Sequence, residues 1–272
     1  MTAVRVGTSG WSYKNWHGQF YPPEVSRKRE LAYLATKFDT VEINGTFYSL
    51  TKPAHCDAWR AQVPSTFVFA IKGSRYITHM LKLQNVTVAM ANFLSSGILR
   101  LGRHLGPILW QLPAMVHFDA AKAASFFEQL PRNMRDAERL AGQHDERTSD
   151  RAATEAPDGR RLKLRHALEV RHDSWLSKEA LSLLAKHNIA LVAADTAGKF
   201  PFSLERTADF AYVRLHGSTE LYTSGYTAEE IQVWAKQIRR WSRTDDVYVY
   251  FDNDAKVFAP KDAAALITAL EC

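Results

Sequence analysis

Residues 40–44 read Thr-Val-Glu-Ile-Asn, and residues 211–216 read Ala-Tyr-Val-Arg-Leu-His. In both stretches an aliphatic residue alternates with a polar or aromatic one, which is the period of a β-strand whose side chains point to opposite faces. One face of each strand is apolar enough to pack against helices, while the other becomes polar toward the strand's end. That combination is typical of barrel strands, in which one face looks into the barrel and the other is covered by helices.

Eight β-rich runs follow one another along the chain, at 4–7, 40–44, 67–72, 108–112, 167–171, 190–195, 211–216 and 247–252. Helical patterns fall between them, around 27–37, 54–62, 86–101, 119–130, 177–187, 227–242 and 261–270, while a helix at 200–209 is doubtful. Alternation of strands and helices indicates a parallel sheet. A chain of 272 residues fits a barrel of about 250 residues. We therefore predict a single α/β domain over 1–272, a (β/α)8 TIM-like barrel, with a doubly wound open sheet as the alternative.

One segment, 131–165, interrupts this alternation with runs of charged residues and few apolar ones. We expect a short helix followed by a mobile loop, that is, a variable insertion. It links the fourth helix to the fifth strand, which places it on the amino-terminal face of the barrel. That face of a β/α barrel serves stability rather than chemistry.

The charge, the cysteines and the apolar runs of the chain indicate which partners and which cellular compartment to expect. The formal net charge of +6 and the isoelectric point near 9.3 favour anionic partners. Two cysteines, Cys56 and Cys272, lie in a helical stretch and at the chain end, so we expect no structural disulfide and a reducing compartment. No signal peptide and no run of about 18 apolar residues is found, which predicts a cytoplasmic protein without a membrane partner.

Polar side chains gather at the predicted carboxyl ends of the strands. Barrel enzymes place their catalytic groups at that end, and charged groups inside a barrel must be solvated, paired or bound to a ligand. The sequence therefore predicts a polar pocket there, with a structural network of internal ion pairs as the alternative. Its members are Glu42, Asn44, Lys72, Gln111, Glu169, Arg171, Asp195, Arg214, His216 and Asp252.

The loops after the strands add aromatic and amide side chains that we expect to contact a ligand. In the first loop Trp11 and Tyr13 are predicted to form a wall for a sugar or base, while Trp16 and Phe20 pack. The glycines of the seventh loop, 217–226, would let it move as a lid. The remaining predicted ligand contacts in the loops are Trp175, Tyr222, Tyr226 and Asn253.

Standard motifs for phosphate loops, dinucleotide binding, zinc and serine-triad chemistry are absent. A divalent metal is an alternative, because Glu42, Glu169, Asp195, His216 and Asp252 could converge as ligands. Three cations, Lys72, Arg171 and Arg214, would share the same mouth and repel that ion. We therefore predict no metal and no cofactor.

These residues resemble the YecE-like family of barrels (domain of unknown function 72). The matching segments run through nearly the whole chain in order: VGTSGWSY at 6–13, FYP at 20–22, VEINGTFY at 41–48, Lys72 with ITH at 77–79, QLP at 111–113, EVRHDSW at 169–175, YVRLHG at 212–217 and VYFDND at 249–254. The resemblance implies a β/α barrel and names no reaction. This chain has Asp252 where the family tends to have asparagine, which adds a carboxylate to that corner.

Our first hypothesis is an enzyme, of the hydrolase or isomerase type, that acts by acid/base chemistry on a small anionic substrate carrying a phosphate or carboxylate. Glu42 or Glu169 would be the general base and His216 the acid. Lys72, Arg171 and Arg214 would hold anionic oxygens, and Asn44, Gln111 and Asn253 would orient the substrate. The alternatives are a nucleic-acid binding or processing protein that uses the same mouth, and a non-catalytic ligand-binding protein. The oligomeric state is left open.

Overall fold

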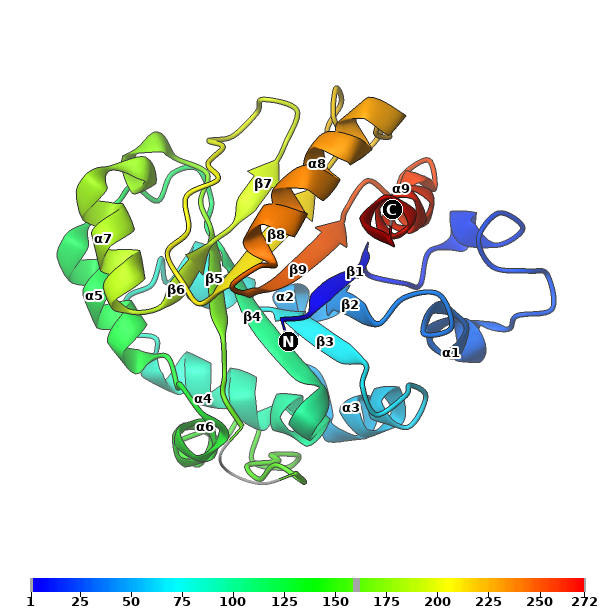
Figure 1. Cartoon of the computed structure of the whole chain (residues 1–272). Helices are drawn as coiled ribbons and strands as arrows, with labels where there is room; N and C mark the ends of the chain where they lie inside the picture. The colour runs from blue at the N-terminus through cyan, green and yellow to red at the C-terminus, as the bar shows by residue number, and fades with distance from the viewer. Residues whose placement is uncertain (1, 159–161, 272) are drawn as a thin grey trace.

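The core of the protein is one parallel sheet, described here from a computed structural model that covers residues 2–158 and 162–271. Neighbouring strands in the sheet follow the order β6-β5-β4-β3-β2-β1-β9-β8-β7 (Figure 1). Their bounds are β1 Val4–Ser9, β2 Thr40–Ile43, β3 Val68–Lys72, β4 Leu105–Gln111, β5 His166–Glu169, β6 Ile189–Leu191, β7 Ala193–Asp195, β8 Phe210–Leu215 and β9 Asp246–Phe251.

The sheet closes into a barrel at its sixth predicted strand, which is split in two around Val192. The first half, β6, pairs with β5, while the second half, β7, pairs with β8. Because β1 also pairs with β9, strand order follows chain order around a nearly closed ring. The predicted barrel is confirmed. The doubly wound alternative is wrong, because such a sheet reverses its strand order and leaves two edges.

Helices surround the ring on its outer side (Figure 1). Their bounds are α1 Glu30–Leu34, α2 Gly45–Tyr48, α3 Pro53–Arg60, α4 Thr87–Ser95, α5 Ala120–Gln129, α6 Met134–Ala141, α7 Lys178–Lys186, α8 Ala228–Trp241 and α9 Phe258–Glu271, with short 3₁₀ or π turns η1 Lys14–Trp16, η2 Arg27–Arg29, η3 Tyr76–Met80, η4 Ile98–His104 and η5 Asp173–Leu176. Local sequence fixes several of their starts. In α8 the Thr227 hydroxyl accepts from the amide of Glu230, and the Glu230 carboxylate accepts from the amide of Thr227, a capping box.

The alternation seen in the sequence sorts the side chains as expected. Val41, Ile43, Val213 and Leu215 belong to the large apolar core between the sheet and the helices. A second, smaller cluster fills the inside of the barrel and consists of Ala70, Leu109, Ala167, Ala190, Val192, Ala194, Phe210, Tyr212, Tyr248 and Tyr250. Side chains of this cluster thus occupy the barrel interior, and the polar side chains at the carboxyl ends of the strands form a separate layer, called the polar layer below.

The helical ring has one interruption. Residues 196–209, all within the described part of the chain, form no helix between β7 and β8, which agrees with the doubt raised by the sequence at 200–209. The loop is tied to the split strand instead, because Thr207 Oγ1 donates to the carbonyl of Ile189 at 2.6 Å and accepts from the amide of Leu191 at 2.8 Å.

The insertion at 131–165 contains the predicted short helix, α6, which packs against α4. After it, Asn92 on α4 exchanges hydrogen bonds with Asp145, and the Asp158 carboxylate pairs with Arg60. The mobility of this segment stays a prediction, and its residues 159–161 lie outside the described part.

Two further expectations concern the cysteines and the membrane. Cys56 is a buried free thiol whose pKa burial raises to about 12, while Cys272 lies outside the described residues. Within residues 2–158 and 162–271, every helix is too short or too polar to cross a bilayer.

Closure of the barrel between β1 and β2 depends on a glycine, which yields a first prediction. A Cβ built on Gly7 would lie 2.1 Å from the carbonyl oxygen of Thr40. We expect Gly7→Ala to lower the free energy of unfolding by about 1–3 kcal/mol, the usual cost of overpacking. Urea denaturation of the purified variant measures the loss.

Gly45→Ala is the matched control, because nothing lies within 4 Å of a Cβ at Gly45, the first residue of α2. It should leave the unfolding free energy unchanged or raise it by less than about 1 kcal/mol. Equal losses in the two variants would contradict the close approach of β1 and β2.

Candidate functional site

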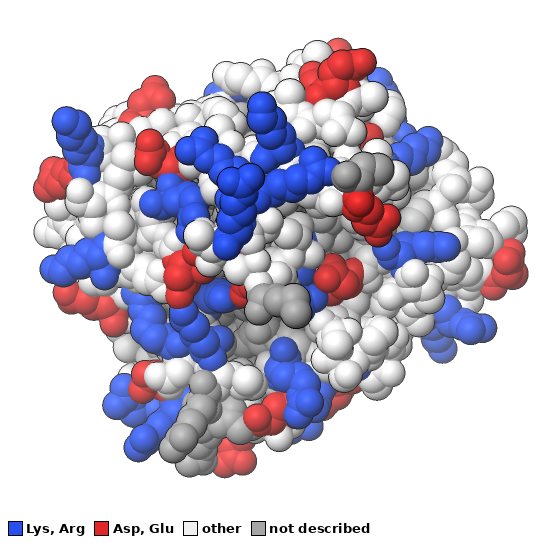
Figure 2. Space-filling model, viewed as in Figure 1, with Lys and Arg blue, Asp and Glu red and all other residues white. Residues whose placement is uncertain are grey.

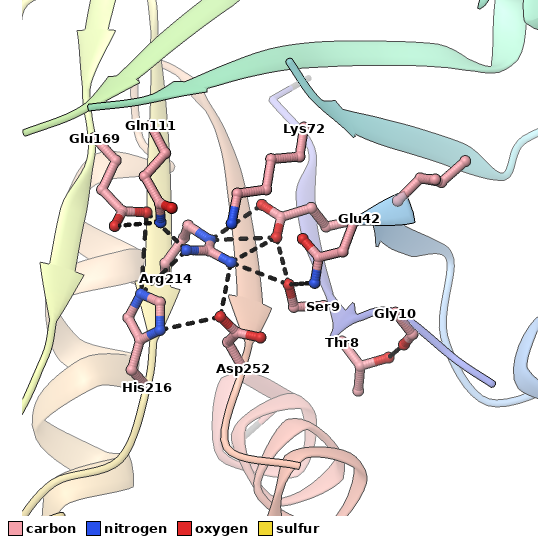
Figure 3. A network of polar contacts seen from close by, with 12 residues as sticks. Thr8, Ser9, Gly10, Glu42, Lys72, Gln111, Glu169, Arg214, His216 and Asp252 are labelled. Carbon is pink, nitrogen blue, oxygen red and sulfur yellow. Dashed lines mark hydrogen bonds and ion pairs between the residues drawn. The ribbon is translucent and has the colours of Figure 1, made fainter. Parts of the chain in front are cut away.

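The polar layer of the barrel is organised around the guanidinium group of Arg214, on β8. Its side chain is fully buried, and each of its three nitrogens donates hydrogen bonds to carboxylates from other strands (Figure 3). Nη2 lies 2.8 Å from Glu42 Oε1 on β2 and 2.8 Å from Asp252 Oδ2 after β9, while Nη1 lies 2.7 Å from Glu169 Oε2 on β5. The three carboxylates that the sequence placed at the mouth therefore converge on one cation.

The strand register explains why these side chains meet. Ser9 aligns with Glu42 between β1 and β2, and Gln111 aligns with Glu169 between β4 and β5. Since carboxyl ends of parallel strands lie at one end of a barrel, inward-facing residues there share a layer. Gln111 uses this proximity to donate from Nε2 to Glu169 Oε1 at 2.7 Å.

Glu42 is the most heavily bonded carboxylate of the layer. Besides Arg214, it accepts from the Tyr212 hydroxyl at 2.6 Å and from the Ser9 hydroxyl. Asn44 joins the group by donating from Nδ2 to Ser9 Oγ at 2.8 Å. Sequence analysis missed Ser9, because it ended the first strand at Gly7, whereas β1 continues two residues further.

Burial alone would raise the pKa of Glu169, but the guanidinium groups of Arg214 and Arg171 hold that pKa well below its ordinary range. Asp252 behaves similarly, since Arg214 and His216 outweigh its burial and lower its pKa to about 2. Burial opposes the charge of Arg214, yet Glu42, Glu169 and Asp252 raise its pKa well above the usual value. Glu169, Asp252 and Arg214 are therefore charged at neutral pH, and a carboxylate with so low a pKa is a weak base.

His216 is enclosed by the same network. Its Nε2 lies 3.2 Å from Nη1 of Arg214, and its Nδ1 lies 3.1 Å from Asp252 Oδ2. Because a guanidinium can only donate, Nε2 must be the acceptor, and we assign the proton to Nδ1, which faces the carboxylate. Nε2 is thus engaged by Arg214, whereas Nδ1 faces Asp252 without hydrogen-bond geometry, and the imidazole is fully buried.

Lys72, at the end of β3, differs from Arg214 in having no charge partner. Its side chain is only 8% exposed and makes no hydrogen bond or ion pair with the described residues. Its Nζ lies 4.5 Å from the centre of the Phe47 ring, a cation–π contact. Burial and the nearby Arg214 lower the pKa of this amine.

Arg171 and His79 complete the cationic side of the mouth. The guanidinium of Arg171 stacks over the Phe200 ring at 4.5 Å and reaches Glu169 Oε1 only at 3.4 Å. Burial, Arg171 and Lys72 lower the pKa of His79 to about 4, so its imidazole is neutral at pH 7. In the sequence His79 was part of a segment that matches the family but was not included in the predicted site.

Other predicted ligand contacts lie around or outside this layer. Tyr222 places its ring 5.4 Å from that of His216, and Tyr13 donates its hydroxyl to the Ser9 carbonyl at 2.5 Å. Trp11 is partly buried and packs edge-on against Trp59, at 5.6 Å between ring centres.

Four predicted residues are not brought to the polar layer: Trp175, Asp195, Tyr226 and Asn253. Trp175 is buried in the outer core, where its indole donates to the Val116 carbonyl at 2.9 Å. Asp195 lies on the opposite side of its strand from Ala194 and accepts from the Tyr226 hydroxyl at 3.1 Å. Asn253 is buried and donates to Asp262 and to the Ser224 carbonyl, which ties the seventh loop to α9. All four therefore have structural partners in the fold.

The contacts of Arg214 and its carboxylates affect two predicted roles, substrate binding by Arg214 and metal binding by the carboxylates. Arg214 was expected to hold substrate oxygens, but its nitrogens are already taken up by the chain's own acceptors. No group of three or more potential ligands suited to a metal ion is found within residues 2–158 and 162–271. Glu42, Glu169 and Asp252 direct their oxygens at the guanidinium, so the donor set for the metal alternative is committed elsewhere.

Comparison with known proteins adds the family. The model of the family described as "Protein of unknown function DUF72" matches residues 5–272. The chain belongs to the DUF72 family. The YecE-like resemblance predicted from the sequence is thereby confirmed.

Relatives of this DUF72 protein extend over its length. The curated protein YecE of Escherichia coli (strain K12) is 23% identical over 95% of this chain and 89% of its own. A DUF72 family protein from Thermotoga maritima MSB8, solved by crystallography, is 26% identical with a TM-score of 0.78 and covers 99% of this chain and 100% of its own. D-psicose 3-epimerase from Clostridium cellulolyticum H10 is only 10% identical, with a TM-score of 0.51 and full coverage of both chains, so it shares the barrel fold.

The dependence of three carboxylates on one guanidinium yields a prediction for Arg214→Met. Removal of one partner from a buried ion pair typically costs about 3–5 kcal/mol, because the remaining charges are left uncompensated. We expect a loss of that order at pH 7, measured by urea denaturation, and a loss below about 0.5 kcal/mol in the exposed control Arg243→Met.

The stability lost in Arg214→Met should depend on pH. Because the folded-state pKa values of Glu169 and Asp252 are depressed, they stabilise the wild type above their unfolded pKa values, and this contribution disappears as the pH falls toward about 2. Without Arg214 these carboxylates take up protons more readily on folding. The difference in unfolding free energy between the variant and the wild type should therefore shrink below about pH 5. A difference that is constant from pH 7 to pH 4 would contradict the network.

Proposed function

We propose that this protein is an enzyme that binds a small anionic substrate at the carboxyl end of the barrel, with Lys72 as the group that takes up and returns a proton. The single observation that carries the proposal is the buried amine of Lys72, which has no charge partner among the described residues. A buried ammonium is costly unless paired, so the fold keeps it for a purpose other than stability.

The lowered pKa of Lys72 supports the role of a base. Lowering the pKa of an amine makes its unprotonated form easier to reach, and that form can accept a proton from a bound substrate. Glu169 is a poorer choice because its pKa is held far below neutrality. The proposal therefore transfers the acid/base role from Glu42, Glu169 and His216 to Lys72 and leaves those three as the rigid floor of the site.

Arg171 supplies the anion-binding group in this proposal. Its guanidinium is partly exposed and has only long contacts with Glu169, so it retains N–H groups for a phosphate or carboxylate. Asn44 supplies an acceptor, because its buried Oδ1 receives no hydrogen bond from the described residues. The proposal thus combines Lys72 with an anion-binding group, Arg171, and a hydrogen-bond acceptor, Asn44.

The reactivity of Lys72 is directly measurable. Trace labelling with acetic anhydride at a series of pH values, followed by peptide mass spectrometry, reports the titration of individual lysines. We expect the labelling midpoint of Lys72 to lie below that of the exposed Lys52, because burial and Arg214 disfavour its ammonium form. A midpoint equal to or above that of Lys52 would refute the role of base.

Anion binding is tested by thermal denaturation with inorganic phosphate, oxalate or chloride at matched ionic strength. A ligand of the native state present at about 100 times its Kd should raise stability by about 2.7 kcal/mol. The effect of phosphate or oxalate should be lost in Arg171→Met and retained in Arg29→Met, an exposed arginine of η2. Equal responses in both variants, or none in the wild type, would remove the anion site.

Nucleic-acid binding at the same mouth is the second candidate, favoured by the net charge of +6. Its aromatic platform is limited to Trp11 and Tyr13, because Trp16 packs as the sequence predicted and Tyr21 is also fully buried. Affinity for a single-stranded oligonucleotide that falls steeply with salt would support it. Anion binding without turnover of any substrate would instead favour a ligand-binding protein.

A further inference from the structure

A long groove lies on the outside of the barrel, away from the polar layer and its chemistry. It has a volume of about 870 Å³ and runs between α8 and the loop that follows β7. In most β/α barrels a helix fills this position, but residues 196–209 of this chain form none. The groove is therefore the place of the absent helix in the outer ring.

The walls of the groove are apolar and exposed. Val233 on α8 is 68% exposed, while Phe202 and Leu204 on the loop are 50% and 41% exposed. At its floor, Trp234 meets Phe202 edge-on, with 6.1 Å between ring centres. Exposed large apolar side chains that gather in one concavity mark an interaction site rather than an ordinary surface.

Cations line the same groove along α8. Lys236 and Arg240 follow Val233 at intervals of three and four residues, so they share its face of α8, and Arg243, just after the end of the helix, also lines the groove. They make no ion pair with the described residues, in contrast to Arg206 nearby, which pairs with Asp245. Figure 2 shows Lys and Arg side chains gathered over α8 on this face of the molecule.

We propose that this groove binds an acidic amphipathic helix of a partner protein. The apolar stripe of such a helix would cover Phe202, Leu204 and Val233, as the missing barrel helix would. Its acidic flank would lie against Lys236, Arg240 and Arg243, and charge complementarity of this kind guides association and orientation. Binding of a helix in an apolar groove is a common mode of recognition.

The observations disfavour other occupants. A second copy of the chain would bring like charges together, because each copy carries a net charge of +6 and the same basic face. A phosphate backbone would cover the cations but leave the Phe202 and Leu204 walls in water. A bilayer surface is flat, whereas the apolar side chains here line a concavity.

The test uses a fluorescent synthetic peptide of about 18 residues, long enough for five turns. It carries leucine on one helical face and glutamate on the other. One comparison peptide has the same composition with its leucines scattered around the helix, and another has lysine in place of glutamate. Fluorescence anisotropy with the full-length protein measures each affinity at low and physiological salt.

We expect the acidic amphipathic peptide to bind and the two comparison peptides to bind at least about tenfold more weakly. Val233→Asp and Arg240→Glu should each weaken binding by about tenfold or more. The matched controls are Val88→Asp, at another exposed valine on α4, and Arg29→Glu, at an exposed arginine of η2; both should leave binding within about twofold.

Each contrary result overturns the proposal. Failure of the acidic peptide to bind excludes an acidic helix as the occupant, and equal binding of the scattered peptide shows attraction by charge alone. Binding of oligothymidylate or of vesicles rich in phosphatidylglycerol that Val233→Asp and Arg240→Glu abolish, without peptide binding, assigns the groove to nucleic acid or membrane. Circular dichroism of every variant separates these results from loss of folding.

Discussion

A single buried cation sets the architecture of the polar end of this barrel. Arg214 has no exposed surface, and a guanidinium in such a place is tolerated only when carboxylates and hydrogen bonds replace its water. Its partners Glu42 on β2, Glu169 on β5 and Asp252 just after β9 are far apart in the sequence. The barrel has to close, with these strands in their observed register, before the charges can neutralise one another.

The same network divides the cations of the mouth into two kinds. Arg214 is saturated by the protein and holds its neighbours in place, while Lys72 and Arg171 retain capacity for other groups. The ion pairs with Arg214 lower the pKa values of Glu169 and Asp252, and the lowered pKa makes each carboxylate a poor base. Stability and reactivity therefore belong to different residues of one layer, and our functional proposal follows from that separation.

The outer layer shows a related division. The helices that cover β1 to β5 complete the apolar core, whereas the stretch between β7 and β8 has a loop in place of a helix. Thr207 satisfies the backbone of the split strand there, so the barrel remains closed without that helix. The uncovered flank of α8 is thus compatible with a stable fold and open to a partner.

Strand alternation at 40–44 and 211–216 by itself determined which side chains face the barrel interior, because that periodicity is a local property of an extended backbone. Lys72 and Arg214 were equivalent at that level, as both were cations at strand ends. Only the tertiary structure decided that Arg214 forms ion pairs with three carboxylates, whereas Lys72 forms none with the described residues. Ser9 and Asp195 illustrate the same limit, since the end of β1 and the break at Val192 depend on neighbouring strands. Distances between strands arise from barrel closure, which no single stretch of sequence encodes.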